Sequence, residues 1–197
     1  MQLTSKKSPS SFTPMIKIVD NFFDIEYAQS LHHQATSRSD LNDSTFSGYK
    51  SIDFLQLELQ NDVISRHFPE LHAYKLVRSW GFIYESGSQG VPPHADPADL
   101  NLNIWLTPNE CIDDASMNGL KIWTLRRPDD WSFSSYNANT RKINDFIGDA
   151  RPIHIPYQFN RATLFCSSLF HSTDNVSTLP GPQNRRVSYT FLFQKQY

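Results

Sequence analysis

His94 and Asp96 open the stretch HADPADLNLNIWLTP and are separated by a single alanine. Residues two apart in an extended chain project to the same face, so this imidazole and this carboxylate could bind one metal ion together. Two ligands hold a metal ion poorly, and a third ligand is needed. We expect it to be His171, which follows the strand-like stretch ATLFCSSLF and would lie at a barrel mouth. The other candidates considered are His67, His72 and His154.

Arg186 and Ser188, in the C-terminal stretch RRVSYTFLF, are again two residues apart. A planar guanidinium beside a hydroxyl is a good clamp for a carboxylate. Arg185 is the alternative clamp, but we favour Arg186 because Ser188 shares its side. The opposite, apolar face of this strand would consist of Val187, Tyr189 and Phe191. Two histidines and one aspartate around a metal ion leave coordination positions open, as in the facial triad of non-haem Fe(II) oxygenases.

Taken in order, these segments resemble the Fe(II)/2-oxoglutarate-dependent oxygenases over roughly residues 15 to 195. The stretch MIKIVDNFFDIEYAQSLHHQA looks like the opening strand and helix of that family. The stretch IYESGSQGVPPHAD resembles the family's first core strand, glycine turn and His-x-Asp motif. The stretches LNLNIWLTP and GLKIW resemble its next pair of strands. The distal histidine and the Arg-x-Ser strand are similar to NRATLFCSSLFH and RRVSYTFLF.

The resemblance implies that His94, Asp96 and His171 ligate Fe(II). It also implies that Arg186 pairs with the distal carboxylate of 2-oxoglutarate, supported by Ser188, while the 2-oxo acid end chelates the iron. O2 would then oxidise an organic substrate, normally by hydroxylation, with release of succinate and CO2. The protein would position the reacting C–H bond and prevent the oxidant from reacting without substrate.

Two further residues are candidates for contact with the cosubstrate or substrate. Tyr84 lies where the family often has a pocket tyrosine, although a core tyrosine is the alternative reading. Asn103 shares one strand face with Asn101 and Trp105. If that face points inward, Asn103 could hydrogen-bond 2-oxoglutarate or substrate, and if it points outward these residues are ordinary exposed polar positions. The aromatic residues bordering the long insert would line the substrate mouth or simply pack; they are Trp123, Trp131 and Tyr136.

Composition indicates an ordinary globular protein. The 197 residues include 39% hydrophobic and 19% charged residues, and the formal net charge is −2, which disfavours nucleic acid as a partner. No apolar run could span a membrane and no signal core is present, so we expect a cytoplasmic protein. Cys111 and Cys166 are expected to be reduced thiols. The chain ends just after its last strand, so we expect a monomer.

The predicted elements lead to a mainly β fold, a double-stranded β-helix (a cupin-like jelly roll) with N-terminal flanking helices. Residues 1–14 read as a disordered leader, and residues 15–197 as one domain. We expect a helix over residues 24–35, with His32 and His33 at the surface, and a second helix over 55–68. Six or more short strands follow residue 73. An insert at about residues 126–148 would form a lid and contain a short helix.

The substrate class is left open between a small molecule and a protein side chain. Nucleic-acid demethylases of this superfamily carry a second arginine six positions after the first. Counted from Arg186 that position is Leu192, and counted from Arg185 it is Phe191, so we exclude nucleic-acid repair. The alternative function is a cupin-like metal-dependent binding protein or isomerase without redox chemistry.

Overall fold

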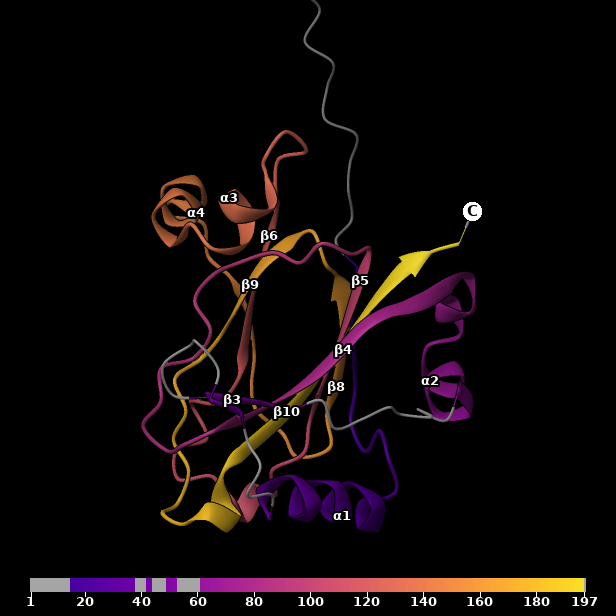
Figure 1. The fold of residues 1–197 in the computed structure, drawn as a ribbon, viewed down its shortest axis with the longest axis vertical. Coiled ribbons are helices and arrows are strands. Elements are labelled where there is room, and N and C mark those ends of the chain that lie inside the picture. Colours follow the sequence, from indigo (N-terminus) through magenta and orange to yellow (C-terminus); the bar gives the residue numbers. More distant parts are fainter. Residues whose placement is uncertain (1–14, 38–41, 44–48, 53–60, 197) are drawn as a thin grey trace, which may run out of the picture.

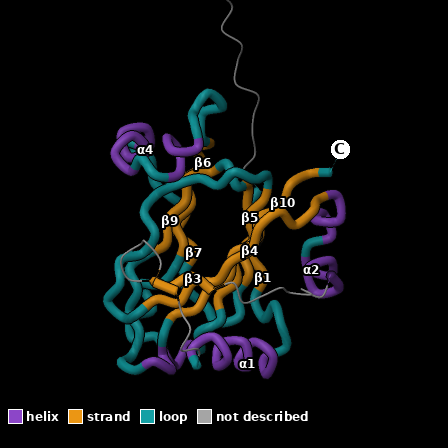
Figure 2. Tube along the Cα trace, viewed as in Figure 1, coloured by secondary structure: helices purple, strands orange, loops and turns teal. Residues whose placement is uncertain are grey.

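The computed structural model describes residues 15–37, 42–43, 49–52 and 61–196. Its strands form two antiparallel sheets, and Figure 2 shows them on opposite sides of a barrel. The larger sheet has the order β1-β8-β5-β10-β4-β3-β2 and the smaller has the order β7-β6-β9. The strands of the larger sheet are β1 (Ile16–Val19), β8 (Ala162–Cys166), β5 (Leu100–Trp105), β10 (Arg186–Lys195), β4 (Tyr74–Tyr84), β3 (Tyr49–Ile52) and β2 (Asn42–Asp43). Those of the smaller sheet are β7 (Ile153–Ile155), β6 (Leu120–Arg126) and β9 (Leu169–Thr173).

Helices lie outside the barrel (Figure 1). The α-helices are α1 (Ile25–Thr36), α2 (Asn61–His67), α3 (Phe133–Asn137) and α4 (Thr140–Ile147). Short 3-10 turns are η1 (Pro69–Ala73), η2 (Asn109–Cys111) and η3 (Pro182–Asn184). Among the described residues, no helix is long and apolar enough to cross a membrane. The predicted leader and residues 55–60 of the predicted second helix lie outside the described residues.

Strand β10 is the centre of the larger sheet, because it pairs with both β4 and β5 along most of its length. Val187, Tyr189 and Phe191 belong to the main apolar core, together with residues of α1, as their alternation predicts. The other face of β10 carries Ser188 and Thr190 and is directed into the barrel. One face of β10 therefore packs in the apolar core, and the other face provides side chains that line the barrel interior.

Helix α1 covers the end of the barrel at which β10 begins. Ala28, Leu31 and Ala35 bury its apolar face. The prediction of a surface position was wrong for His32, whose exposed fraction is 5%, whereas His33 is exposed. His32 is tolerated inside because its Nε2 donates a hydrogen bond of 3.0 Å to the carbonyl of Arg185, so its polar group is satisfied.

The predicted strand ATLFCSSLF is in fact two strands in different sheets. The chain leaves β8 of the larger sheet, turns at Ser167 and Ser168, and enters β9 of the smaller sheet. The amide of Asp96 bonds the carbonyl of Ser167, and the amide of Ser167 bonds the carbonyl of Asp99. These contacts fix the crossing beside the segment that carries His94 and Asp96. His171 therefore lies within β9 and not after a single long strand.

The insert between β6 and β7 contains two helices. The short helix expected within this insert is α4, whose first turn is capped by the side chain of Asn139. Trp123 and Tyr136 are buried in a cluster with Ile143 and Phe170, so these aromatic residues pack the insert onto the smaller sheet. Of the two predicted roles, lining the substrate mouth or packing, Trp123 and Tyr136 therefore have the second.

Candidate metal and cosubstrate site

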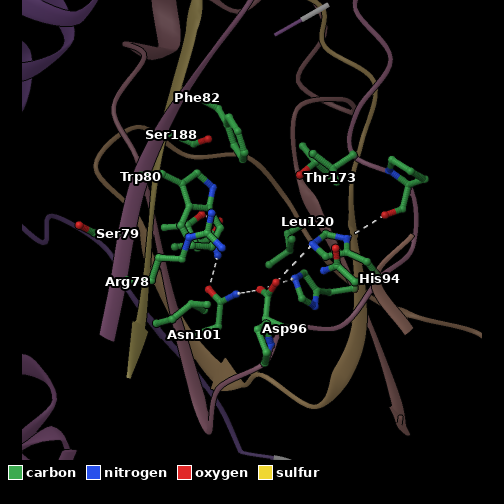
Figure 3. A pocket seen from close by; sticks show the side chains of 18 of the residues that line it. Arg78, Ser79, Trp80, Phe82, His94, Asp96, Asn101, Leu120, Thr173 and Ser188 are labelled. Carbon is green, nitrogen blue, oxygen red and sulfur yellow. Dashed lines mark hydrogen bonds and ion pairs between the residues drawn. The ribbon is translucent and has the colours of Figure 1, made fainter. Parts of the chain in front are cut away.

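The structure brings together the three side chains singled out as metal ligands. One donor atom each of His94, Asp96 and His171 lies within 4.8 Å of the others. The Asp96 carboxylate is 4.0 Å from Nε2 of His94 and 3.4 Å from Nε2 of His171. All three residues line one pocket, and Figure 3 shows His94 and Asp96 facing each other there. Among the described residues, no other group of His, Cys, Asp and Glu has this arrangement.

A backbone bridge positions the two histidines. The sequence pattern predicted that His94 lies in a regular strand, but the structure places it in an isolated antiparallel bridge with His171. The two residues exchange backbone hydrogen bonds of 2.9 and 2.8 Å. Asp96 is bound two residues further on through its amide to Ser167. The two segments that carry the three side chains are therefore joined before any metal ion is considered.

Both histidines have their ring tautomer set by a carbonyl. Nδ1 of His94 lies 2.9 Å from the carbonyl of Pro92, and Nδ1 of His171 lies 3.0 Å from that of Leu169. A carbonyl only accepts, so each Nδ1 carries a proton, and each Nε2 is the ring nitrogen directed towards Asp96. Burial, and next the neighbouring His171, lower the pKa of His94 to about 4 against the attraction of Asp96. At neutral pH this imidazole is therefore in the form that binds metals.

The carboxylate of Asp96 is oriented by a short series of amides. Nδ2 of Asn101 donates to Oδ2 of Asp96 at 2.6 Å, Nδ2 of Asn103 donates to Oδ1 of Asn101 at 2.5 Å, and Thr190 donates to Asn103 at 3.3 Å. Burial raises the pKa of Asp96, but His171, His94 and Asn101 together hold it below its ordinary value. The face shared by Asn101 and Asn103 thus points inward, and Asn103 reaches the site through Asn101.

Arg186 is a buried cation without an acidic partner. Its exposed fraction is 1%, and its Nε and Nη2 donate to the backbone carbonyl of Asn118 at 3.1 and 2.9 Å. Three aromatic rings surround the guanidinium, at 5.0 Å for Tyr84, 5.8 Å for Trp105 and 5.5 Å for Tyr157. Nη1 is buried with no hydrogen-bond partner, and no carboxylate of the described residues forms an ion pair with Arg186. An unpaired donor on a buried guanidinium marks a place for an anion.

The backbone around Arg186 is held from two sides. The carbonyl of Arg185 accepts hydrogen bonds from His32 and from the Thr107 hydroxyl, each at 3.0 Å. The amide of Val187 donates to the same hydroxyl at 2.7 Å. The side chain of Arg185 points away and forms an ion pair with Glu85 at 2.8 Å. Arg186 rather than Arg185 is therefore the arginine that faces the interior.

Tyr84 and Ser188 line the pocket, and Tyr84 of β4 is paired with Arg186 of β10. Burial raises the pKa of Tyr84, while the positive charge of Arg186, and next the hydroxyls of Thr173 and Ser188, act in the opposite direction. The tyrosine is therefore a neutral hydroxyl at neutral pH. Arg186, Tyr84 and Ser188 together can bind a carboxylate through charge and hydroxyl donors.

The pocket has a volume of about 380 Å³ and reaches from Tyr84 past the histidine pair to the insert. Phe133 and Asn137, on α3, contribute to its wall. These two residues were missed by sequence reasoning, which singled out the tryptophans and tyrosine of the insert. Asn118 was also missed, although the dipeptide Asn118–Gly119 is a recognisable signal for a turn with positive φ, and Asn118 has a φ of 69°.

No protein-family model matches the chain, and no curated protein matches it. Solved structures do resemble it. HygX from Streptomyces hygroscopicus, with nickel and 2-oxoglutarate bound, has a TM-score of 0.63 at 11% identity, covering 94% of this chain and 84% of that one. The carbocyclase SnoK from nogalamycin biosynthesis has a TM-score of 0.67 at 8% identity, covering 91% and 79%. A prolyl-4-hydroxylase from Pseudomonas putida has a TM-score of 0.55 at 13% identity, covering 94% and 95%.

At these identities the likeness is one of fold. A structure from Burkholderia pseudomallei that is described as an oxidoreductase of the 2OG-Fe(II) oxygenase family also resembles the protein, with a TM-score of 0.58 at 10% identity, covering 92% of this chain and 84% of that one. The predicted fold class, a mainly β double-stranded β-helix with flanking N-terminal helices, is confirmed. The chain therefore has the fold that its motifs indicate, that of the 2-oxoglutarate–Fe(II) oxygenases.

Proposed function

We propose that this protein is an Fe(II)- and 2-oxoglutarate-dependent oxygenase that hydroxylates an organic substrate. The observation that carries the proposal is the joint placement of His94, Asp96 and His171 with the unpaired guanidinium of Arg186. A two-histidine, one-carboxylate set is the ligand type of non-haem Fe(II) oxygenases. A buried cation with a free donor in the same barrel interior suits the far carboxylate of a dicarboxylic cosubstrate.

In this proposal His94, Asp96 and His171 hold Fe(II) through Nε2, a carboxylate oxygen and Nε2. Arg186 binds the distal carboxylate of 2-oxoglutarate, and Tyr84 and Ser188 donate hydrogen bonds to it. When bound, the metal and 2-oxoglutarate supply the oxidising chemistry with O2, releasing succinate and CO2. Asn101 holds Oδ2 of Asp96, which leaves Oδ1 for the metal. Asn103 has a supporting position behind Asn101.

The neighbouring folds include proteins described as an epimerase, a carbocyclase and a hydroxylase, so fold does not select the outcome. We propose hydroxylation because Asp96 completes the ligand set, whereas halogenating relatives lack the carboxylate. Incorporation of isotopically heavy O2 into product tests this choice. A product without the isotope would favour an oxidation that forms no C–O bond.

The first test of the function is an anaerobic titration with Fe(II) and 2-oxoglutarate, following the weak visible charge-transfer band of the chelate. We expect the band in the wild type. Asp96→Ala should remove it, and Asp149→Asn, which changes an exposed carboxylate outside the site, should retain it. A wild type that binds metal without the band would instead support a cupin-like binding protein or isomerase.

A further inference from the structure

The pocket is closed on one side by a continuous wall of two paired strands. On β4, the alternate residues Arg78, Trp80, Phe82 and Tyr84 face the pocket. On β10 the residues paired with the first three are Leu192, Thr190 and Ser188. Tyr84 is paired with Arg186, at the end proposed for the cosubstrate. Arg78 lies six residues away at the other end, a separation of roughly 20 Å along an extended strand.

The level of Arg78 on the wall is also that of the proposed metal ligands. Leu192 pairs with Arg78 on one side and with Asn101 on the other. Asn101 in turn bonds Asp96. A molecule that contacts Arg78 would therefore lie beyond the cosubstrate and beside the metal site. This is the place of the substrate in the proposed function.

Fixed charge in this outer part of the pocket is positive. Of the residues lining the pocket, the one carboxylate belongs to Asp96, and Arg78 is the one arginine or lysine. Asp96 is engaged by Asn101 and by the proposed metal ion. A cationic substrate would find no free counter-ion, whereas an anionic substrate would find an exposed guanidinium.

Aromatic surface adjoins this guanidinium. Arg78 lies over Trp80, with its central carbon 5.3 Å from the ring centroid, and Figure 3 shows the two side chains close together on the pocket wall. Such stacking holds a cation in place. Nε1 of Trp80 is buried without a hydrogen-bond partner. Phe133 on α3 contributes a ring that is 51% exposed at the pocket edge.

We propose that the substrate is a small organic carboxylate with a flat apolar body. Its carboxylate pairs with Arg78, and its body lies against Trp80 and Phe133 with the reacting carbon towards His94 and Asp96. This inference rests on the proposed function and specifies its substrate class. The whole cavity of about 380 Å³, which includes the cosubstrate end, is in the range of small-molecule sites, and this supports a free small acid as the ligand.

The test uses matched probes that differ in charge. A set of phenyl- and indolyl-carboxylates, each with its carboxamide and its amine, is titrated into the full-length protein loaded with Ni(II) and 2-oxoglutarate, and affinities are measured by ligand-observed NMR. We expect the carboxylates to bind about fivefold or more tightly than the carboxamides, as for a partly exposed charge pair. The amines should be the weakest probes.

Variants assign the preference to Arg78. Arg78→Gln should remove the preference for carboxylates, and Arg78→Lys should retain part of it. Lys75→Gln is the matched control, because Lys75 is an exposed cation on the same strand but does not line the pocket. It should leave the preference unchanged. Equal binding of carboxamides or amines, or no binding by any carboxylate, would overturn the proposal.

Failure of the substrate inference is separable from failure of the function. The Fe(II)–2-oxoglutarate band is recorded for each variant alongside the NMR titration. A band without selective carboxylate binding rejects the substrate class alone. An Arg78-dependent preference without the band supports an acid-binding pocket and rejects the oxygenase.

Discussion

The two ends of the pocket wall each carry an arginine, but in opposite surroundings. Arg186 is 1% exposed, bonded to the Asn118 carbonyl and enclosed by aromatic rings, and its backbone is held by Thr107. Arg78 is exposed and rests on a single ring. A rigid, pre-oriented cation suits a ligand that never changes, such as a common cosubstrate. An exposed cation can adapt its position to a substrate. The wall therefore places binding of the cosubstrate at one end and binding of the substrate at the other.

The strongest way to break this comparison is to remove the buried charge. Arg186→Met keeps the length of the side chain but removes the cation, and we expect the affinity for 2-oxoglutarate to fall by about a hundredfold or more, since hydrogen bonds to charged groups contribute about 1.5–3 kcal/mol each. The free energy of unfolding of the ligand-free protein should change little, because removal of a buried charge without a counter-ion opposes the loss of both donors to the Asn118 carbonyl. Isothermal titration calorimetry and urea denaturation measure the two quantities.

Arg185→Met is the matched control for that experiment. It removes the neighbouring arginine, whose side chain forms an ion pair with Glu85 on the outside. Affinity for 2-oxoglutarate should remain at the wild-type level. If both variants lost affinity equally, the buried arginine would have no special role.

The metal site lies between the two ends, and Asn101 tests how firmly it is held. Asn101→Ala removes the donor to Asp96 and should weaken Ni(II) and Fe(II) binding by about 10- to 100-fold, the usual effect of losing a residue that orients a ligand. Asn103→Ala, one step further away, should have a smaller effect. Competition with a chelator measures both affinities. An unchanged metal affinity for Asn101→Ala would show that the orientation of Asp96 does not depend on the hydrogen bond from Asn101.

The backbone clamp at the buried end can be opened without touching Arg186. Thr107→Val keeps the shape of the side chain but leaves the Val187 amide without its acceptor. We expect the free energy of unfolding to fall by about 1–3 kcal/mol, the usual cost of an unsatisfied buried donor. Affinity for 2-oxoglutarate should fall with it, while carboxylate selectivity at Arg78 should persist. A parallel loss at both ends would mean that the wall behaves as one unit.

The smallest expected effect is a pH dependence at the same end. Burial lowers the pKa of His32, although its bond to the Arg185 carbonyl acts in the opposite direction. Below the ordinary histidine pKa of about 6.5, the unfolded chain binds a proton that the folded chain does not, so stability falls as pH decreases. Denaturation of wild type and His32→Gln between pH 7.5 and 5 measures this slope, which the variant should flatten. His33→Gln, at an exposed position, should keep the wild-type slope.

The sequence predicts structure correctly where the residues of a single strand alternate between two faces. The apolar face of β10 and the inward side of Arg186 follow from alternation alone, and the motif order led to the correct fold. Contacts between distant elements were beyond it. The burial of His32 depends on where α1 meets Arg185, and the turn at Ser167 and Ser168 depends on bonds to the Asp96 segment. Neither partner is visible in a local pattern.

The same division holds within the candidate site. The spacing of His94 and Asp96 suggested a shared strand face, whereas the structure places His94 in an isolated bridge. Whether Asn101 and Asn103 point inward could not be decided, because a strand with polar residues on one face fits either orientation. Asn118 bonds Arg186 through its backbone carbonyl, which no side-chain pattern encodes.

The bridge between His94 and His171 has a consequence for the order in which the site is assembled. Joining two segments far apart in the chain costs loop-closure entropy, which a metal ion would otherwise have to supply from its binding energy. Here the two backbone hydrogen bonds of the bridge already close that loop. The metal ion would then bind to a site whose backbone is already folded, and folding would not depend on it. It could be exchanged for another divalent ion while the barrel stays intact.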